Sequence, residues 1–306
     1  MCFRNNCVTI PGDELEDIAQ RLEASDRYRV LRRLDLASCL DKRDKGPTRI
    51  GMFLDIESTS LDRLTCEPIE LAIFPFEYSG DGTVVAVDAP LHLLNEPSEP
   101  ISPEITAITG ITSEMVAGHR IDPAEVAIFV DRAAIVIAHN ATFDRPIAER
   151  ISPVFQTKPW ACSMCDVDWQ GEGFKGRRLA DLLGGYGLFF EAHRAIDDCE
   201  AGIALLTQTL PRSERGVLDV LLSTARRSTK RIFAVGAPFE SRDKLKRRGY
   251  KWNVIPAFGP RAWWIDFDAT QVEAELCFLE TEIFHRRIDL PIQEITAYER
   301  YSIRTD

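Results

Sequence analysis

The sequence predicts a three-layer α/β domain with a mixed β-sheet, followed by a small α+β domain. Between residues 50 and 210, apolar segments with strand character alternate with segments of helical spacing, which is typical of a sheet covered by helices. From residue 230, shorter strand and helix patterns begin again. We therefore expect a helical N-terminal extension (1–48), a main domain (49–210), a connecting helix or linker (211–229) and a small accessory domain (230–306).

The first predicted elements are helical. Leu15, Ile18 and Leu22 recur at near-helical spacing and predict a helix over residues 13–24, and residues 28–34 predict a second short helix. After a polar stretch, residues 50–57 form an apolar strand that ends in acids.

A hairpin is expected next. Residues 69–78 and 83–94 read as strands, and the turn composition of residues 79–82 between them favours an antiparallel pair. The first of these strands should therefore pair with its successor and give the sheet its antiparallel part.

Helix signals then surround one buried strand. Ser102 and Pro103 suit the start of a helix that ends at Gly110, and Asp122 opens a capping-box pattern for a helix that runs to Val130. The remaining elements expected here are a strand over 133–138, a turn over 139–144 and helices over 144–151 and 195–209.

The last part of the chain predicts a connecting helix and then a compact α+β arrangement. The expected elements are helices over 213–227, 239–248 and 270–287 and strands over 231–235, 250–253 and 262–267.

Composition limits the class of protein. The chain has 306 residues, 45% of them hydrophobic and 28% charged, which is ordinary for a globular protein. It shows no apolar run of signal-peptide length at its start and none near the roughly 18 residues of a membrane span. Eight scattered cysteines are too few for a disulfide framework. We expect a cytoplasmic protein with reduced thiols and no membrane partner.

Charge is distributed unevenly along the chain. The net charge is −11, yet residues 211–251 hold twelve Lys or Arg against four Asp or Glu. Tyr250, Trp252, Trp263 and Trp264 lie in or near this basic stretch. Cations beside aromatic rings suit single-stranded nucleic acid, although such runs are more often solvated helix faces and core tryptophans.

Three short acidic motifs follow one another at the ends of predicted strands or the starts of helices. They are Asp55-Ile-Glu57, His139-Asn140-Ala-Thr-Phe143-Asp144 and His193-Arg-Ala-Ile-Asp-Asp198. Side chains alternate across a strand, so Asp55 and Glu57 share one face. Four neighbouring carboxylates repel one another unless cations neutralise them, and oxygen ligands favour Mg²⁺ or Mn²⁺ over zinc. The motifs therefore predict a metal-dependent phosphodiester hydrolase with two divalent ions.

One histidine suits proton transfer at such a site. His193 precedes Asp198 by five residues, on the loop that enters a helix. A neutral imidazole there is a natural base for the attacking water. Asp197 is an alternative metal ligand to Asp198.

Together the three motifs resemble those of the DEDD exonucleases in their histidine variant, as in the proofreading epsilon subunits of bacterial DNA polymerase III. Residues 101–115 are similar to the segment that follows the first motif in that family. The resemblance implies a ribonuclease H-like fold and removal of nucleoside 5′-monophosphates from 3′ ends. It also implies that Asp55, Glu57 and Asp198 hold one ion, with Asp55 shared with the second.

The same resemblance makes Thr59, Leu61 and Phe143 candidates to hold the terminal base and sugar. One position departs from the family pattern, since Ser60 stands where a glycine is usual. Ser60 leaves the metal ligands untouched and bears on substrate fit.

Other signals receive structural interpretations. His139 ends a buried strand and is expected to be a hydrogen-bonded structural residue, and residues 171–176 a loop rather than a dinucleotide site. Cys162 and Cys165, even with Cys2 and Cys7, favour thiols over a zinc site.

The leading hypothesis is a 3′-to-5′ exonuclease acting on single-stranded DNA, with a polymerase as a candidate partner. The alternatives are an RNA-trimming exonuclease of the same fold and a non-catalytic module that binds nucleic acid or a polymerase. The motifs leave DNA and RNA unseparated, because nothing in them reads a 2′-hydroxyl.

Overall fold

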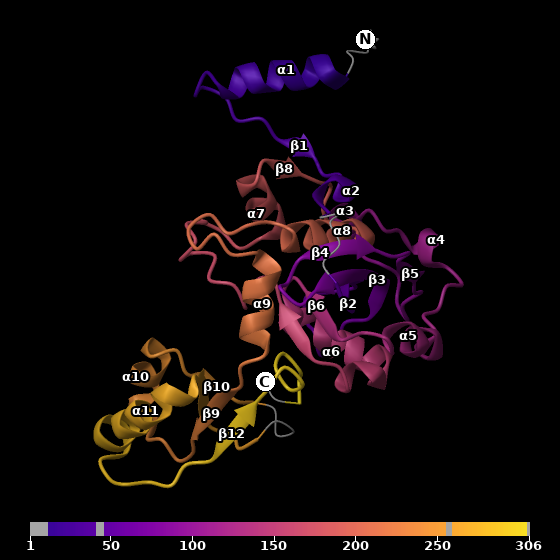
Figure 1. Ribbon diagram of the computed structural model, residues 1–306. Coiled ribbons are helices and arrows are strands. Elements are labelled where there is room, and N and C mark those ends of the chain that lie inside the picture. The colour runs from indigo at the N-terminus through magenta and orange to yellow at the C-terminus, as the bar shows by residue number, and fades with distance from the viewer. Residues whose placement is uncertain (1–11, 41–45, 255–258, 305–306) are drawn as a thin grey trace.

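The computed structural model describes residues 12–40, 46–254 and 259–304 (Figure 1). Its centre is a sheet in the order β4-β3-β2-β6-β7, with β5 also paired to β3. The strands β2, β6 and β7 are parallel, and β3 is antiparallel to β2, β4 and β5. The predicted mixed sheet is therefore confirmed. Its strands are β2 (Thr48–Ser58), β3 (Pro68–Ser79), β4 (Val84–Val87), β5 (Leu91–Leu94), β6 (Ile135–Ala138) and β7 (Trp160–Cys162).

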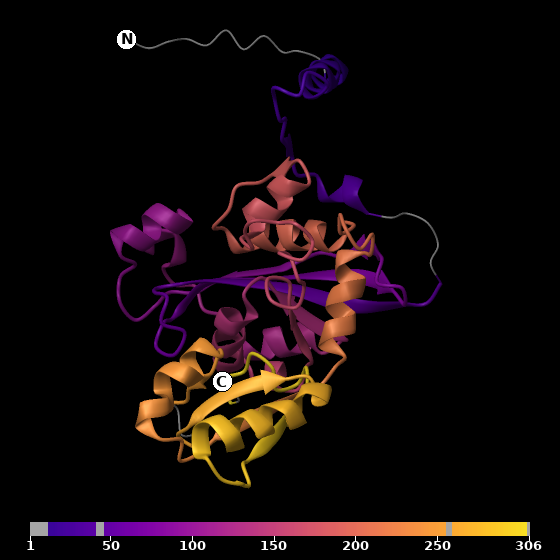
Figure 2. The ribbon, with the colours of Figure 1, turned by 90° about the vertical axis from the view of Figure 1, so that its left-hand side faces the viewer.

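Helices cover both faces of this sheet, as the view along its edge shows (Figure 2). On one face a large apolar cluster joins the sheet to α7 (Leu179–Gly185), α8 (Ala195–Leu206) and α9 (Val217–Ala225). On the other face a second cluster joins it to α5 (Pro123–Val130) and α6 (Ala141–Ile151). The three-layer prediction is confirmed.

Short elements complete this part of the molecule. They are α1 (Gly12–Glu23), β1 (Arg32–Arg33), α2 (Leu36–Cys39), α3 (Pro103–Thr109), α4 (Ser113–Val116), a 3₁₀ turn (Pro153–Gln156) and β8 (Leu188–Phe189).

A separate antiparallel sheet, ordered β10-β11-β9-β12, forms the small C-terminal α+β domain. An apolar cluster joins this sheet to its helices, so the domain has its own core. The boundaries assigned above to the four parts stay predictions. The elements of this domain are β9 (Thr229–Ala234), a 3₁₀ turn (Phe239–Ser241), α10 (Arg242–Arg247), β10 (Lys251–Trp252), β11 (Trp263–Phe267), a second 3₁₀ turn (Ala269–Gln271), α11 (Val272–Phe278), a π-helical turn (Leu279–Phe284) and β12 (Ile292–Ile295).

The segment after β12 returns to the main sheet. The backbone N–H of Trp160 on β7 donates to the carbonyl of Ala297 (2.8 Å), and the Tyr301 hydroxyl donates to Asp166 (2.5 Å). Arg145 of α6 is fully buried, and its guanidinium donates to the carbonyls of Ala297, Tyr298 and Arg300. The end of the described chain is thus part of the main layer structure.

Several element predictions are wrong in detail. Residues 28–34 form no helix, because Arg32 and Leu34 hydrogen-bond to the backbone of Gly187 and Phe189 and extend the chain as β1. The strand expected over 83–94 breaks into β4 and β5 around Pro90, which cannot donate to a ladder.

Other helices differ from expectation at their ends. The helix that carries Asp144 begins at Ala141, and the last predicted helix turns π-helical and stops at Phe284, since His285 adopts a left-handed conformation (φ 53°). The strands β7, β8 and β12 and the helix α7 were not predicted; they lie in short segments without clear periodicity.

Candidate metal centre

Three of the predicted acids meet at one end of the main sheet. Asp55 and Glu57 lie near the carboxyl end of β2, and Asp198 lies in the first turns of α8. Each of the three offers a carboxylate oxygen, and these oxygens lie within 4.8 Å of one another. Asp197, the alternative ligand, lies outside this group.

A close approach of α8 to β2 brings Asp198 to the strand. Gly202 faces the ring of Phe53, and a Cβ at Gly202 would lie 2.1 Å from it, so a larger residue would push the helix away. One turn earlier, the Cys199 thiol donates to the carbonyl of Phe53 (3.5 Å). Asp198 is therefore held over the strand that carries Asp55.

Asp144 completes the acidic cluster from a third element. It is buried in the first turn of α6. After burial itself, the charge of Asp144 has the largest effect in raising the pKa of Asp55. The structure thus brings all four predicted acids into one electrostatic environment, although Asp144 is not among the three with oxygens within 4.8 Å.

Burial and mutual repulsion make this cluster costly without a cation. Burial, followed by the charges of Asp144, Asp198 and Glu57, holds the pKa of Asp55 well above its usual value. Burial and the charge of Asp198 raise the pKa of Glu57 to about 7. Burial likewise raises the pKa of Asp198 to about 6. Acids that disfavour their own ionisation in this way suit a divalent cation, whose charge removes the repulsion.

His193 stands at the entrance of α8. Its backbone N–H donates to Oδ2 of Asp198 (2.7 Å), and its backbone is left-handed (φ 73°). The side chain is exposed, and its charge lowers the pKa of Asp198, against the larger effect of burial. The imidazole is therefore near the acids and accessible to solvent.

A buried acid that sequence reasoning missed lies directly beside Glu57. Glu70 on β3 is paired in register with Glu57 and is 0% exposed. Its carboxylate accepts from the Arg194 guanidinium (2.7 Å), the backbone N–H of Ala195 (2.9 Å) and the His92 ring (2.7 Å). Burial alone would raise the pKa of Glu70, yet these hydrogen bonds hold it below its usual value.

Glu70 anchors the start of α8 to the sheet through the backbone of Ala195. Ala195 lies two residues after His193 and three before Asp198. The charge of Arg194 also lowers the pKa of Glu57. The ion pair of Glu70 and Arg194 therefore affects the electrostatics of the metal centre. The available signal was a single acid inside the apolar run of residues 68–76.

The predicted substrate residues differ in how far they are exposed to solvent. Leu61 is 90% exposed, whereas Phe143 packs partly into the apolar cluster under α6. The hydroxyl of Thr59 accepts from the backbone of Glu67 (3.0 Å) and so closes the loop between β2 and β3. Ser60 accepts from the backbone of Asp62 within that loop.

The remaining motif residues have structural contacts. His139 bonds to the Ser163 hydroxyl (2.9 Å) and the Arg177 carbonyl (2.8 Å), and burial lowers its pKa to about 4. Cys162 is buried and accepts from the backbone of Ala141, while Cys2 and Cys7 lie outside the described residues. In the part of the chain that the structure describes, no helix is long and apolar enough to span a membrane.

Comparison with known proteins places this site in a family. The family model described as Exonuclease, RNase_T, matches residues 52–206. The chain is 30% identical over 162 residues to a PolC-type DNA polymerase III of Thermotoga petrophila, covering 48% of this chain and 11% of that protein. It is 27% identical over 177 residues to the uncharacterized exonuclease CP81 of Escherichia phage 186, covering 51% and 85%. The chain thus spans about a tenth of the polymerase and most of the phage protein.

Two solved structures are also similar to this chain. An exonuclease X in complex with 5′-overhanging duplex DNA is 25% identical with a TM-score of 0.41, over 56% of this chain and 99% of that one. Exonuclease I of E. coli with a dA16 oligonucleotide is 14% identical with a TM-score of 0.48, over 74% and 66%. Since the family match spans half of the sequence and includes all four acids of the site, this chain belongs to the RNase_T exonucleases, of DEDD type and ribonuclease H-like fold.

Proposed function

We propose that this protein is a metal-dependent 3′-to-5′ exonuclease that hydrolyses single-stranded DNA and releases nucleoside 5′-monophosphates. The observation that carries the proposal is the set of oxygens from Asp55, Glu57 and Asp198 within 4.8 Å of one another, with buried Asp144 beside them. Three closely spaced carboxylates with raised pKa values serve little purpose in a protein that only binds nucleic acid.

The donor set fits two Mg²⁺ or Mn²⁺ ions, because all its atoms are carboxylate oxygens. In this proposal Asp55, Glu57 and Asp198 would hold one ion, and Asp55 and Asp144 would take part in holding the second. When bound, such ions stabilise the charge on the attacking and leaving oxygens of an in-line displacement at phosphorus.

His193 acts as the general base. It is exposed beside Asp198, where it can take a proton from the attacking water and release it to solvent. Its backbone hydrogen bond to Asp198 holds the main chain of His193 next to the acids.

Thr59, Leu61 and Phe143 are proposed to contact the terminal nucleotide. The exposed side chain of Leu61 is available for a base, and Phe143 stands one residue before Asp144. Thr59 would act from a loop that its hydroxyl already closes.

The similarity to a DNA polymerase III supports DNA as the substrate and a polymerase as a partner. An RNA-trimming activity is the second candidate, since no residue at the described site distinguishes a 2′-hydroxyl. We also propose the domain boundaries given above, with the C-terminal domain guiding the strand.

The test is digestion of 5′-labelled single-stranded DNA and RNA of matched sequence with Mg²⁺, Mn²⁺ or EDTA. We expect a metal-dependent ladder that shortens from the 3′ end and is absent with Asp55→Ala. The sugar that gives the faster ladder identifies the substrate. Binding without cleavage of either strand would replace the proposal with a non-catalytic module.

A further inference from the structure

Two adjoining cavities lie at the carboxyl end of β7, the same end of the sheet at which the acids lie. The larger, of about 950 Å³, lies between the loop after β7 and helix α9, and the smaller, of about 330 Å³, lies between the main sheet and the C-terminal domain. They share Cys165, Asp166, Thr224 and Arg227, so they lie directly next to each other. We call the two together the basic groove.

The groove begins at the catalytic edge of the sheet. Cys165 and Asp166, which line both cavities, follow the carboxyl end of β7, and β7 runs parallel to β6 and β2, whose carboxyl end carries Asp55 and Glu57. The loop after β7 is tied to the same edge, because His139 at the end of β6 bonds to both Ser163 and Arg177. A strand whose 3′ end lies at the acids can therefore continue directly into the groove.

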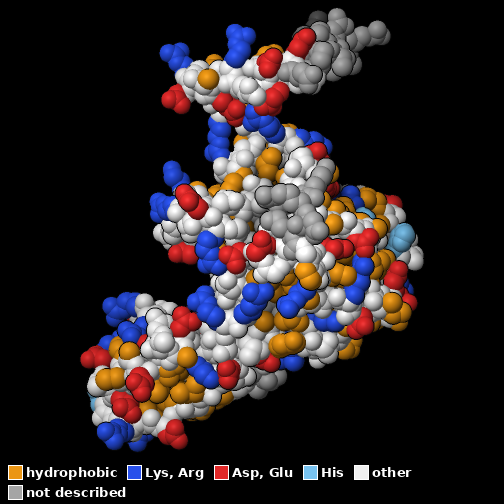
Figure 3. All heavy atoms as spheres, in the orientation of Figure 1, with side chains coloured by type: hydrophobic (Ala, Val, Ile, Leu, Met, Phe, Trp, Pro, Cys, Tyr) orange, Lys and Arg blue, Asp and Glu red, His pale blue; other side chains and the backbone are white. Residues whose placement is uncertain are grey.

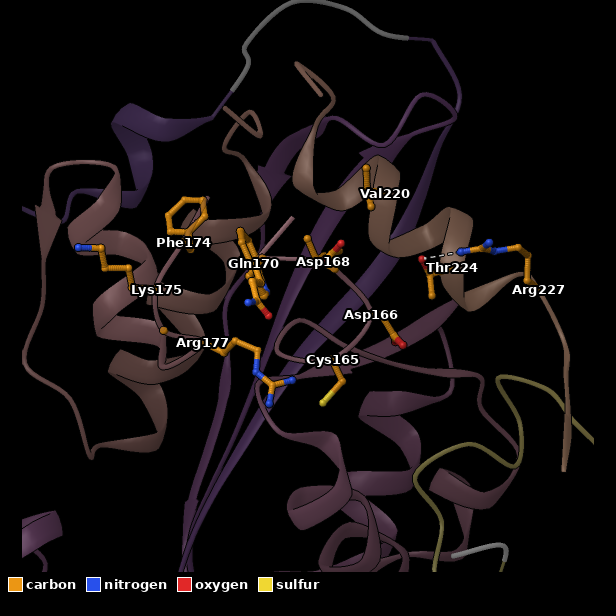
Figure 4. Close-up of a pocket in the computed structure, with 13 residues that line it drawn as sticks. Cys165, Asp166, Asp168, Gln170, Phe174, Lys175, Arg177, Val220, Thr224 and Arg227 are labelled. Carbon is orange, nitrogen blue, oxygen red and sulfur yellow. Dashed lines mark hydrogen bonds between the residues drawn. The ribbon is translucent and has the colours of Figure 1, made fainter. Parts of the chain in front are cut away.

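Figure 4 shows the larger part from within, with Lys175 on one side, Thr224 and Arg227 on the other, and Cys165 and Arg177 between them. On the face in Figure 3, Lys and Arg side chains gather near the level where α9 leads into the C-terminal domain.

Positive charge exceeds negative charge along the lining. Among the described residues the cations are Lys175, Arg177, Arg227, Arg231, Lys251 and Arg300, and the acids are Asp166, Asp168, Asp266 and Asp268.

Two of the acids are already engaged. Asp266 binds Arg231 (2.7 Å), and buried Asp166 accepts from Tyr301 and from the backbone of Cys162. Of the cations, Lys175, Arg177 and Lys251 are exposed and enter none of the salt bridges found among the described residues. The groove thus keeps cations available for a polyanion.

Cations from both domains converge on one point of the groove. A hydrogen bond with Cys162 lowers the pKa of Cys165 to about 7, and the charges of Arg177 and Lys251 act in the same direction. Arg177 belongs to the loop after β7 and Lys251 to β10, and the smaller cavity is lined by Cys165 together with residues of the C-terminal domain.

The tryptophan that lines the smaller part of the groove is less available than the charges. Trp264 is only 7% exposed and packs under Arg231 (3.9 Å) and Lys251 (5.0 Å). Stacking of bases on Trp264, which the sequence suggested, is therefore disfavoured. The groove thus offers mainly charge, to a phosphate backbone.

We propose that the basic groove holds the phosphates of the single strand upstream of its 3′ end, through Lys175 and Arg177 of the main domain and Lys251 of the C-terminal domain. This inference rests on the proposed function and adds a second binding region to it. Its consequence is that a long strand is held at two places, whereas a mononucleotide ester is held at the metal centre alone.

The first test compares wild type with the variant that combines Lys175→Gln, Arg177→Gln and Lys251→Gln. Binding of a long single-stranded oligonucleotide is measured in EDTA at several salt concentrations. Each cation that no longer neutralises a phosphate lowers the slope of log affinity against log salt by about 0.7, so we expect a decrease of about 2 for three cations. Arg226→Gln is the matched control, since Arg226 neighbours Arg227 but lines a different cavity near the start of β2.

Hydrolysis separates this inference from the proposed function. With Mg²⁺, the triple variant should keep wild-type turnover of the p-nitrophenyl ester of thymidine 5′-monophosphate and lose the preference for long strands. An unchanged salt slope, or a slope changed equally by Arg226→Gln, would overturn the groove. If wild type hydrolyses neither substrate, the proposed function fails, while the salt slope in EDTA still decides the groove.

A second test uses Cys165 as a reporter without any hydrolysis. Cys165 and Cys277 are both exposed, and of these two only Cys165 lines the groove. We expect a long oligonucleotide in EDTA to slow alkylation of Cys165 by N-ethylmaleimide and to leave Cys277 unaffected, measured by peptide mass spectrometry. Equal protection of both thiols, or of neither, would contradict a strand in the groove.

Discussion

The metal centre and the basic groove lie at the same end of the main sheet and differ in how their charges are arranged. The acids are withdrawn from water and raise one another's pKa, whereas Lys175, Arg177 and Lys251 are exposed and spread over two domains. Acids that hold the same two ions depend on one another, so removal of a single acid should disable the centre. Charges that act on separate phosphates contribute one by one. A single mutation should therefore abolish the function of the metal centre, whereas mutations in the basic groove should weaken binding step by step.

The largest effect is expected at the centre of the acidic cluster. Asp55→Ala should abolish hydrolysis, because Asp55 is the acid proposed to face both ions, and the measurement is release of labelled nucleotides with Mg²⁺. Asp197→Ala is the control, since Asp197 lies outside the group of three close oxygens. Robust hydrolysis by Asp55→Ala would disprove the metal assignment, and a complete loss in Asp197→Ala would favour that residue as ligand.

Removal of the proposed base should leave measurable residual activity. His193→Ala should slow turnover by about 10²- to 10⁴-fold, the usual contribution of general base catalysis, in single-turnover assays. His193→Asn should do the same, and since Asn tolerates the left-handed backbone better than Ala, it separates loss of the imidazole from strain. Exposed His119 offers a control whose alanine variant should match wild type. Wild-type rates in His193→Asn would assign the proton transfer to another group.

The buried anchor beside the centre should show an intermediate effect. Glu70→Gln leaves Arg194 without its carboxylate and should lower the free energy of unfolding by about 2 kcal/mol in urea. It should also weaken Mg²⁺ affinity by about 10- to 100-fold, as supporting partners of metal ligands do, because it loosens the start of α8. Glu77→Gln, an exposed change on the same strand, should alter neither quantity. Equal effects of both variants would remove the positioning role from Glu70.

The pH dependence of stability tests the repulsion among the acids directly. The folded-state pKa values of Asp55, Glu57 and Asp198 lie above the values of an unfolded chain, so the folded state binds more protons. Stability from these groups is therefore present at low pH and is lost as pH rises through about 6 to 7.

In EDTA at about pH 8, Asp55→Asn should consequently raise the melting temperature. The increase should be about 2–4 °C for each kcal/mol of repulsion among the carboxylates that the substitution removes. Near about pH 5 the gain should be smaller, and Mg²⁺ should stabilise wild type more than the variant. A lower melting temperature of Asp55→Asn at both pH values would contradict the assigned direction.

The smallest effect is expected from Cys162, which together with Cys165 has the spacing of a zinc-binding cysteine pair. Cys162→Ser should leave hydrolysis unchanged and alter stability by about 1 kcal/mol or less, because a serine hydroxyl can also accept from the backbone of Ala141. Loss of activity together with loss of bound zinc would revive the metal interpretation.

Sequence patterns predicted the centre of the fold well and its surroundings poorly. The strand that ends at Glu57, the hairpin that follows it and the helix that carries Asp198 all have strong periodicity or turn signals. The strands β7, β8 and β12 are two to four residues long, too short for a periodic pattern, and their pairing depends on neighbours distant in the sequence. The local amino-acid composition therefore does not indicate which strands pair.

The same contrast applies to the site. The acids stand in recognisable motifs, whereas the role of Glu70 depends on its register with Glu57 and on Arg194, 124 positions later. The groove is equally hard to predict from sequence, because Arg177 and Lys251 line cavities next to the same Cys165 only in the folded protein.

The returning C-terminal segment sets an order of events during synthesis. Arg145, next to Asp144, is fully buried and finds its hydrogen-bond acceptors at residues 297–300 as well as at Glu149. Until residues 297–300 leave the ribosome, a buried guanidinium on α6 lacks most of its partners, and so the helix that carries Asp144 cannot reach its final packing. A nascent chain would therefore carry all of its acidic motifs well before α6 can hold Asp144 in its final position, and the acidic cluster would be completed only once residues 297–300 are available.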